Sequence, residues 1–433
     1  MIGIGVLKNT IQEYAWGSMT AIPELLGQKT PASKPQAELW MGAHPKAPSM
    51  VKLNGEWRSL PALIEEDPEG VLGEATARRY QGRLPYLFKV LAAEKPLSIQ
   101  AHPSLKQARA GFKRENELGI AIDATERNYR DDNHKPELIC ALTDFRAMCG
   151  FRKIHRIISL LERACPLSLA EEIGALQRRP DSVGLKQVYH SLLSLDQNRK
   201  REVVQEALQH AKTSVREDTA FEWLLNLAAG YPEDIGVLSP LFLNLVLLRP
   251  GQAVFLPSGV LHAYLHGVGI ELMANSDNVL RGGLTPKHVD APELLKVLRF
   301  EEGPPEVLVG TEGGGGEQIF TTPAQEFILS AISLKGNETY ASPSDRSIEI
   351  ILCTEGEGTI RDTGGNDVTG LSKGTSVVIP ASINGYQING DLTLSQGRSA
   401  ILTERTFRWA LQRSNSPGHT SHSDFIINPK HET

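Results

Sequence analysis

The stretch PGQAVFLPSGVLHAY, residues 250–264, predicts β structure, because apolar and β-branched residues stand between glycine and proline turns. A similar stretch, KGTSVVIPASINGYQ, occupies residues 373–387. In both, a glycine precedes the internal proline by six residues. This spacing predicts two copies of one β-hairpin element, each within its own β domain.

The two copies differ at one position that matters for chemistry. The fifth residue after the proline is His262 in the first copy and Gly385 in the second. Only the first copy therefore keeps a side chain that can bind a metal ion. If the protein holds a metal, we expect it in the first β domain.

Outward from these segments, the pattern predicts a mainly β chain with a helical insert. Segments such as IHRIISLLERAC and VVQEALQHAKTS space their apolar residues by three and four, which is typical of amphipathic helices. The expected organisation is a discontinuous first β domain at 1–150 and 236–302, a helical domain at 151–235, a second β domain at 317–413 and a polar tail at 414–433. We expect the tail, with His419, His422 and His431, to be frayed rather than metal-binding.

Composition narrows the function classes. The chain has 433 residues, 40% of them hydrophobic and 22% charged, with a net charge of −6, which disfavours a nucleic-acid coat or a polybasic membrane binder. The four cysteines form no C-x-x-C pair, so we expect a reducing, cytoplasmic location. The sequence does not start with a basic stretch followed by an apolar core, and it has no window of 18 uninterrupted apolar residues. We therefore expect neither export nor a membrane span.

Polar side chains line one face of the strand-like segment PLSIQAHPS. The period of two in a strand sends Ser98, Gln100 and His102 to one side, and Ile99 and Ala101 to the other. A solvent-facing polar strand explains this pattern as well as a pair of metal ligands does.

An acid in an apolar strand is a second signal. Glu137 stands before Leu138, Ile139 and Cys140, with Lys135 alternating on the same face. A buried carboxylate is costly unless it is paired or bound to a cation, so Glu137 is either a metal ligand or half of a salt bridge.

His262 completes the set of candidate ligands, with Tyr264 on the same strand face. Alone, such a histidine is more often structural. Together, two imidazoles, one carboxylate and the amide oxygen of Gln100 suit Zn²⁺ as a Lewis acid with room for water or substrate. The single anionic ligand leaves the site with a net positive charge, which preserves its electrophilic strength.

Six segments now resemble a known family, the type I mannose-6-phosphate isomerases. In chain order they are QEYAWG, AELWMGAHP, KPLSIQAHP, NHKPEL, PSGVLHAYL and DNVLRGGLTPKHVD, within residues 10–300. The resemblance implies two cupin-type (jelly-roll) β domains, of which the C-terminal one binds no metal. It also implies zinc-dependent interconversion of mannose 6-phosphate and fructose 6-phosphate, serving mannose use or GDP-mannose synthesis.

The same resemblance assigns residues. Gln100, His102, Glu137 and His262 match the family's metal ligands, with one Zn²⁺ per chain, and Arg281 matches a catalytic arginine. Further matching positions, together with Tyr264, are expected to line the substrate site: Ser98, Lys135, Glu271 and Lys287.

For the chemistry, we hypothesise that an enediolate forms and that Lys135 or Glu271 transfers the proton. A lysine beside a cation gives up its proton more readily, although Lys135 can equally be a hydrogen-bond donor to substrate, and Glu271 can be half of a structural ion pair. Lys287, Ser98 and Arg281 are the candidates for the phosphate, with an ordinary surface lysine as the alternative for Lys287.

Two other classes of function stay open at this point. Two histidines and a carboxylate also suit a non-haem Fe(II) oxygenase, and a non-catalytic sugar-binding cupin is the third candidate. We expect a small-molecule sugar phosphate as the partner, neither nucleic acid nor membrane, and a monomer as the default, since no sequence feature sets the oligomeric state.

Overall fold

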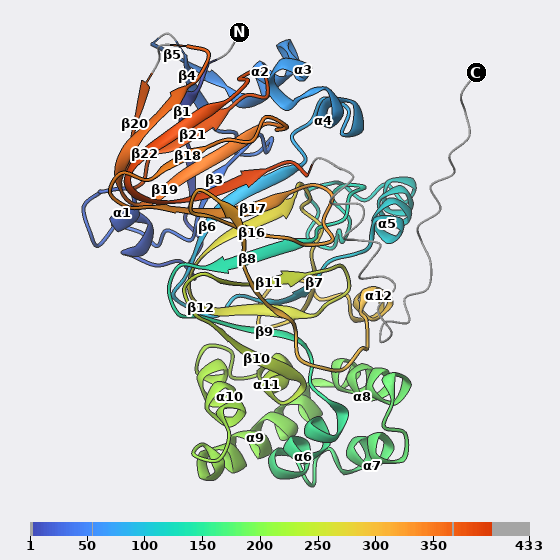
Figure 1. Ribbon diagram of the computed structural model, residues 1–433. Helices are drawn as coiled ribbons and strands as arrows, with labels where there is room; N and C mark the ends of the chain where they lie inside the picture. The colour runs from blue at the N-terminus through green and yellow to red at the C-terminus, as the bar shows by residue number, and fades with distance from the viewer. Residues whose placement is uncertain (1–2, 54, 366–367, 401–433) are drawn as a thin grey trace, which may run out of the picture.

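The computed structural model describes residues 3–53, 55–365 and 368–400 (Figure 1). Within these ranges the strands form two antiparallel sheets of eleven strands each. The expected mainly β fold with a helical insert is therefore confirmed. Residues 401–413 of the expected second β domain, and the expected tail at 414–433 with its histidines, lie outside the described residues.

The first sheet, here called the central sheet, carries the candidate ligands. Strand β12 is its longest member and pairs with four neighbours, β6, β7, β8 and β9. The strands are β2 (Thr10–Gln12), β3 (Glu38–Met41), β6 (Tyr86–Ala93), β7 (Ile99–Ala101), β8 (Glu137–Ala141), β9 (Phe145–Phe151), β10 (Leu243–Leu248), β11 (Gln252–Leu256), β12 (His262–Ala274), β13 (Leu280–Gly283) and β14 (Val307–Val309).

The second sheet, here called the C-terminal sheet, joins both ends of the described chain. Strand β1 pairs with β21 through Gly5↔Val378, so N-terminal strands extend a sheet built mostly from the last third of the chain. Its strands are β1 (Gly5–Lys8), β4 (Met50–Leu53), β5 (Glu56–Ser59), β15 (Thr311–Gly314), β16 (Glu317–Phe320), β17 (Ile328–Leu334), β18 (Thr339–Ala341), β19 (Glu349–Asp362), β20 (Val368–Ser372), β21 (Ser376–Ile379) and β22 (Tyr386–Arg398).

Helices gather at the end of the central sheet opposite the C-terminal sheet (Figure 1). This helical layer contains α6 (Ile154–Ala164), α7 (Ala170–Arg178), α8 (Ser182–Ser194), α9 (Gln197–Ser214), α10 (Thr219–Gly230), the 3₁₀ turn η1 (Ile235–Leu238) and α11 (Ser239–Phe242). The remaining helices are α1 (Ala21–Leu25), α2 (Leu60–Glu66), α3 (Pro68–Leu72), α4 (Glu74–Arg79), α5 (Leu105–Glu117) and α12 (Ala291–Val297).

Short helices α2 and α3 interrupt a region that the sequence pattern predicted as mostly strand. Each begins with a proline in its first turn and a polar cap, the hydroxyl of Ser59 accepting from Ala62 N and the carboxylate of Asp67 accepting from Gly70 N. Proline fits the first helical turn because the N–H it lacks has no partner there anyway. These helices are too short for a periodic signal, and their caps, which could have predicted them, were not used in the sequence analysis.

The predicted hairpins are wrong in their pairing, although the repeat is real. β11 and β12 do not pair with each other, because β8 lies between them. In the same way, β19 lies between β21 and β22. Five residues with extended geometry span two strand spacings of about 4.8 Å, so the connection at 257–261 can skip one strand.

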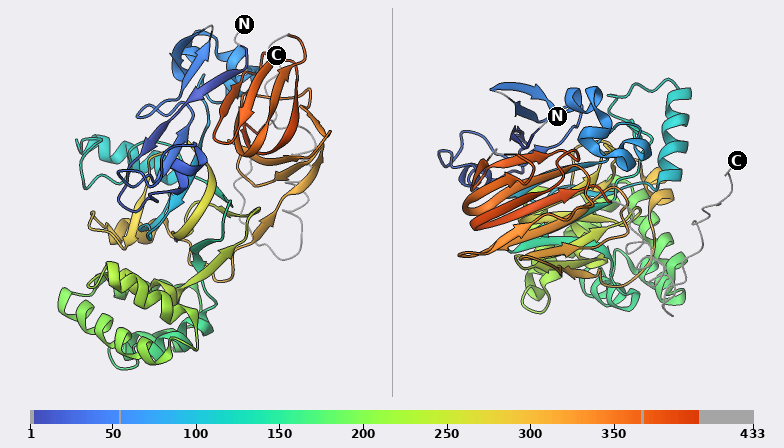
Figure 2. Two further views of the ribbon diagram at one scale, coloured as in Figure 1. Left: turned by 90° about the vertical axis from the view of Figure 1, so that its left-hand side faces the viewer. Right: turned by 45° about the horizontal axis from the view of Figure 1, so that its top comes forward.

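A shared apolar core joins the two sheets. On the central sheet, Phe88 and Leu272 belong to one buried cluster with Leu352 of the C-terminal sheet. At Gly397 the sheets approach so closely that a Cβ would lie 3.1 Å from Leu272 Cδ1. Figure 2 shows the sheets as successive layers above the helices. One face of β12 is therefore committed to this core, and the other face remains for the site.

Candidate metal centre and active site

Three of the four candidate metal ligands come from the ends of neighbouring strands. Glu137 is the first residue of β8, His262 is the first of β12, and His102 directly follows β7. β7 pairs with β12 at Gln100↔His262, and β8 pairs with β11 at Glu137↔Leu256, six residues before His262, so the three strand ends lie close together. The predicted alternation also holds around β7, where Ile99 and Ala101 are buried in the apolar core.

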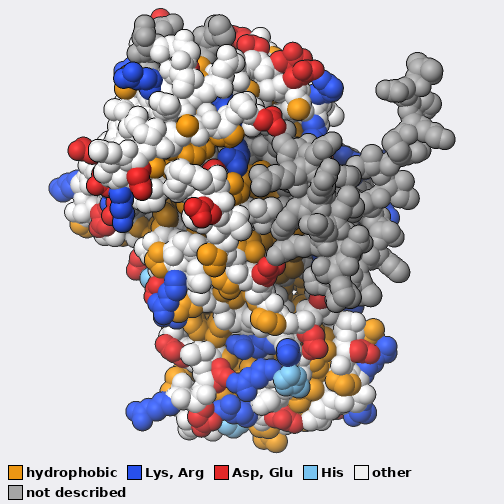
Figure 3. All heavy atoms as spheres, viewed as in Figure 1, with side chains coloured by type: hydrophobic (Ala, Val, Ile, Leu, Met, Phe, Trp, Pro, Cys, Tyr) orange, Lys and Arg blue, Asp and Glu red, His pale blue; other side chains and the backbone are white. Residues whose placement is uncertain are grey.

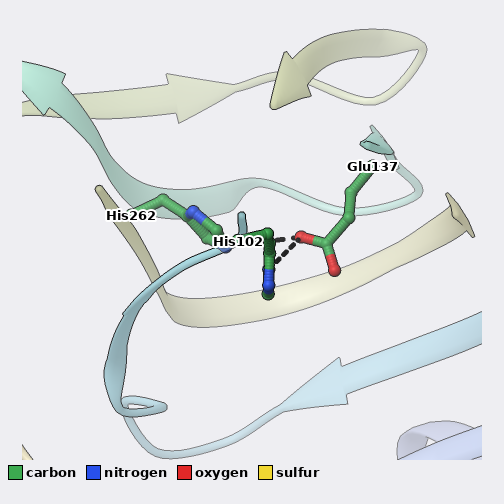
Figure 4. A group of neighbouring side chains, drawn as sticks. All are labelled: His102, Glu137 and His262. Carbon is green, nitrogen blue, oxygen red and sulfur yellow. Dashed lines mark ion pairs between the residues drawn. The ribbon is translucent and has the colours of Figure 1, made fainter. Parts of the chain in front are cut away.

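The three side chains converge on one point in the interior (Figure 4). Their ligand atoms all lie within 4.8 Å of one another. Glu137 Oε2 is 3.3 Å from His102 Nε2 and 3.3 Å from His262 Nε2, and each side chain is about 1% exposed. Among the described residues, none of these three atoms has a hydrogen-bond partner.

Backbone carbonyls orient both imidazoles. His102 Nδ1 lies 2.7 Å from the carbonyl oxygen of Asn278, and His262 Nδ1 lies 3.0 Å from that of Val260. A carbonyl only accepts, so each Nδ1 carries the proton and each Nε2 presents its lone pair toward Glu137. This is the arrangement by which outer groups fix metal-binding histidines. Two nitrogen lone pairs and a carboxylate oxygen aimed at one buried point fit a divalent cation.

Lys135 neutralises part of the charge at this point. Its Nζ lies 3.0 Å from Glu137 Oε1, the oxygen that does not face the histidines. Burial works against ionisation of Glu137, but the positive charge of Lys135 holds the pKa of Glu137 well below its ordinary value. Glu137 thus forms the salt bridge considered from the sequence and also presents its second oxygen to the ligand cluster.

Gln100 and Arg281 lie on strands next to His262. On β7, Gln100 stands directly opposite His262 of β12 on one side and opposite Arg281 of β13 on the other. Opposite residues of antiparallel strands share a face and have Cβ atoms about 5 Å apart. The sheet therefore places an amide and a guanidinium beside the three converging ligands.

Arg281 belongs to a group of cations. Burial lowers the pKa of Arg281, and the charge of Arg130 lowers it further. Lys287 follows β13 and is exposed as a whole residue. Partial desolvation of its ammonium group lowers its pKa, and the charges of Arg281 and Arg130 lower it further. Three cations thus influence one another beside the row of ligands. Arg130 was not identified from the sequence, where it stands in a polar stretch without periodicity.

Ser98 stands just before β7, two residues from Gln100, and is partly exposed. Glu271 and Tyr264 belong to a buried network instead of facing the cations. Glu271 Oε2 accepts from Lys89 Nζ at 3.0 Å, and Glu271 Oε1 accepts from the Tyr264 hydroxyl at 3.0 Å. Glu271 therefore forms the ion pair that was the alternative to its catalytic role.

Lys89 is a site residue that the sequence reasoning missed. It lies in the middle of β6, in the apolar run YLFKVLAA, and its Nζ is also 3.8 Å from Glu38 Oε1. Burial opposes its charge, yet Glu271 and Glu38 raise its pKa above the ordinary value. A charged residue within an apolar strand was the signal that identified Glu137, and the same signal applies to Lys89.

The space-filling view shows Asp and Glu interspersed with Lys and Arg over the face drawn, with a group of Lys and Arg side chains over the helical layer (Figure 3). Within the described residues, His102, Glu137 and His262 form the only group of histidine, cysteine or acidic residues with metal-ligand spacing. At the equivalent of His262 in the repeat, a Cβ on Gly385 would meet the Thr363 hydroxyl at 3.1 Å.

None of the described helices is long and apolar enough to span a membrane.

Fold and site together define a cupin-type β protein with a two-histidine, one-carboxylate metal centre. Residues 316–399 match the family described as "Mannose-6-phosphate isomerase, cupin domain". Residues 4–154, which include His102 and Glu137, match "Phosphomannose isomerase type I, catalytic domain".

Whole-chain comparisons agree. Mannose-6-phosphate isomerase of Escherichia coli is 43% identical over 386 residues, covering 89% of this chain and 96% of that protein. A variant of phosphomannose isomerase from Salmonella typhimurium has a TM-score of 0.85 at 40% identity, covering 92% of this chain and all of that one. A crystal structure of zinc-bound mannose 6-phosphate isomerase has a TM-score of 0.84 at 40% identity, with the same coverage. The chain belongs to the mannose-6-phosphate isomerase family.

Proposed function

We propose that this protein is a zinc-dependent isomerase that interconverts mannose 6-phosphate and fructose 6-phosphate. One observation carries the proposal: three buried ligand atoms, from His102, Glu137 and His262, converge without hydrogen-bond partners among the described residues. Membership in the family, and the zinc in a relative of similar structure, support the substrate and the metal.

The donor set fits zinc. Two neutral imidazoles and one carboxylate are a common catalytic set, and we propose Gln100 as the fourth protein ligand because it stands opposite His262. When bound, Zn²⁺ would act as a Lewis acid that stabilises negative charge on substrate oxygens.

Isomerisation requires one proton to leave C2 and return at C1, while the hydroxyl proton moves from O2 to O1, through an enediolate. We propose Lys135 for the carbon proton: its Nζ lies 3.0 Å from Glu137 Oε1 at the edge of the cluster, and beside a bound cation it would give up its own proton more readily, which leaves the neutral amine that can accept the proton from C2. Both oxygens of Glu271 already accept hydrogen bonds, so we propose that Glu271 and Tyr264 shape the site. Arg281, beside Gln100, would add positive charge near the enediolate.

We propose that the phosphate of the substrate binds beside the three cations Arg281, Arg130 and Lys287. Lys287 is exposed, and Arg281 and Arg130 both lower its pKa, which indicates a concentration of positive charge suited to a dianion. Ser98, just before β7, is proposed as a hydroxyl donor.

The cellular role is part of the same proposal. The four cysteines, Cys140, Cys149, Cys165 and Cys353, are unpaired and buried, which supports a reducing cytoplasm. There the reaction would serve mannose use or GDP-mannose synthesis. The default expectation of a monomer stays a prediction.

The test is a coupled assay of purified protein with mannose 6-phosphate, before and after chelation and after zinc restoration, with elemental analysis of the metal. We expect one zinc per chain and turnover that chelation abolishes and zinc restores. Zinc at one per chain without turnover would contradict the isomerase and favour a binding role. Iron in place of zinc would favour an oxygenase.

A further inference from the structure

The loop between α5 and β8, residues 118–136, contains turns and bends and no helix or strand, yet it ends at Lys135 beside Glu137. Two hydrogen bonds fix the middle of this loop. Glu115 of α5 accepts from Tyr129 N at 2.8 Å, and the Asn278 side chain accepts from Arg130 N at 2.7 Å.

A third contact fixes the end of the loop and involves a residue that is far away in the sequence. His134 Nε2 lies 2.8 Å from Glu326 Oε1, and 192 positions separate the two residues. Glu326 is 8% exposed and precedes Phe327, which is buried in the core between the sheets. Burial works against its ionisation, but His134 holds the pKa of Glu326 below its ordinary value.

This contact constrains the residue next to Lys135. On one side of Lys135, His134 is tied to Glu326. On the other side, Pro136 fixes its own φ and restricts Lys135 to extended backbone, and the Pro136 carbonyl accepts from Ala274 N at 3.1 Å. Lys135 therefore has a fixed residue before it and a fixed residue after it.

We propose that Glu326 is a positioning residue for the isomerisation site. Through His134 it fixes the end of the 118–136 loop, and so the position of Lys135 Nζ against Glu137. The loop between β16 and β17 of the C-terminal sheet thus contributes to catalysis, although the described part of that sheet holds no metal ligands. This inference rests on the proposed function.

The test compares Glu326→Ala and Glu326→Gln with the same two substitutions at Glu317. Glu317 is a matched control, because it is a buried glutamate that pairs with Arg398 at 3.1 Å within the C-terminal sheet. In Glu326→Ala we expect kcat to fall roughly tenfold with KM and zinc content little changed, because a small misplacement of a reacting group is costly. Glu326→Gln keeps an oxygen that can pair with His134 and should recover kcat to within about threefold of wild type.

Hydrogen exchange measured by mass spectrometry on the metal-free protein gives a readout independent of activity. Exchange in 130–136 should rise in Glu326→Ala and stay at the wild-type level in Glu317→Ala. Unchanged exchange, or unchanged kcat despite faster exchange, would overturn the proposal.

Two safeguards keep the test decisive. If Glu326→Ala does not fold, Glu326→Asp withdraws the carboxylate by one methylene, and the same loss of kcat is then required of it. If wild-type protein shows no turnover of mannose 6-phosphate, the proposed function fails. If wild type is active and the Glu326 variants match it, only the positioning role fails.

Discussion

Arg281 and Lys287 carry neighbouring positive charges that differ in their exposure. Arg281 is partly buried and stands opposite Gln100, whereas Lys287 is exposed, six residues farther along the chain. A cation close to the reacting carbons should stabilise charge that develops in the transition state, and one farther out should stabilise the bound phosphate throughout.

Substitution should separate these roles. Arg281→Ala should lower kcat by about a hundredfold, as for loss of one preorganised donor, with zinc retained. Lys287→Ala should raise KM by about tenfold with a smaller change in kcat, because a charge-assisted hydrogen bond to phosphate contributes equally before and during reaction. Steady-state kinetics and metal analysis measure both effects. Lys113→Ala, at an exposed lysine on α5, is the control. A normal kcat in Arg281→Ala, or a normal KM in Lys287→Ala, would remove that residue from its assigned role.

Residue-level reasoning identified candidate ligands where a polar side chain interrupts an apolar strand pattern, as at Glu137. It did not identify Arg130 or Asn278, which lie in polar segments with no periodicity. Their position depends on hydrogen bonds between loops, such as Arg130 N to Asn278 Oδ1 across 148 positions. No local pattern encodes such a contact.

At the scale of elements, the segment between β12 and β13 is held by Asp277 as well as by Asn278. Lys46 Nζ lies 2.6 Å from Asp277 Oδ2, and His44 Nε2 lies 3.6 Å from Oδ1. Burial alone would raise the pKa of Asp277, but His44 and Lys46 outweigh it and lower the pKa. The segment that orients His102 through the Asn278 carbonyl is thus tied to the loop after β3.

The lowered pKa of Asp277 predicts how the free energy of unfolding depends on pH. Because the folded pKa lies below the unfolded value of about 3.9, the stabilisation is present above that pH and is lost as pH falls through the folded pKa. Asp277→Asn should therefore cost about 1 kcal/mol at pH 7 and progressively less below pH 4 or so. Urea unfolding of both proteins from pH 7 downward measures the difference. A difference that does not change with pH would show that Asp277 acts without its charge.

Strand β12 shows how one element serves two environments. Its alternation sends Glu271 toward the buried polar network and Leu272 toward the C-terminal sheet. The period of two was readable from the sequence, but the pairing was not. β11 and β12 looked like a hairpin, and the structure places β8 between them. Because β8 precedes both along the chain by about a hundred residues, only tertiary contacts insert it there.

For the whole molecule, the apolar core between the sheets is the main link between the metal centre and the last third of the chain. Leu272 is fully buried there with Phe88, Leu138 and Leu352. Leu272→Ala should lower the free energy of unfolding by about 2–5 kcal/mol, because it leaves a cavity in a close-packed core. Zinc content should not change, since Leu272 faces away from the site.

Chemical denaturation and metal analysis test this prediction. Leu247→Ala provides the matched control, because Leu247 is a partly exposed leucine on β10, at 36% exposure, and its truncation should cost about 0.5 kcal/mol or less. Equal effects of the two substitutions would contradict the view that the core between the sheets stabilises the molecule.

Three properties could be predicted from local patterns, because residue chemistry and short-range periodicity are local: the types of ligand, the strand faces that carry them, and the helical character of the segment inserted between β9 and β10. Contacts between distant segments, in contrast, bring the ends of β7, β8 and β12 together, pair Lys89 with Glu271 across 182 positions, and join Glu326 to His134. Alternation shows which side of a strand is buried, but it does not show which strand lies beside it. That choice depends on packing between segments far apart in the chain, where a whole apolar face must be covered at once.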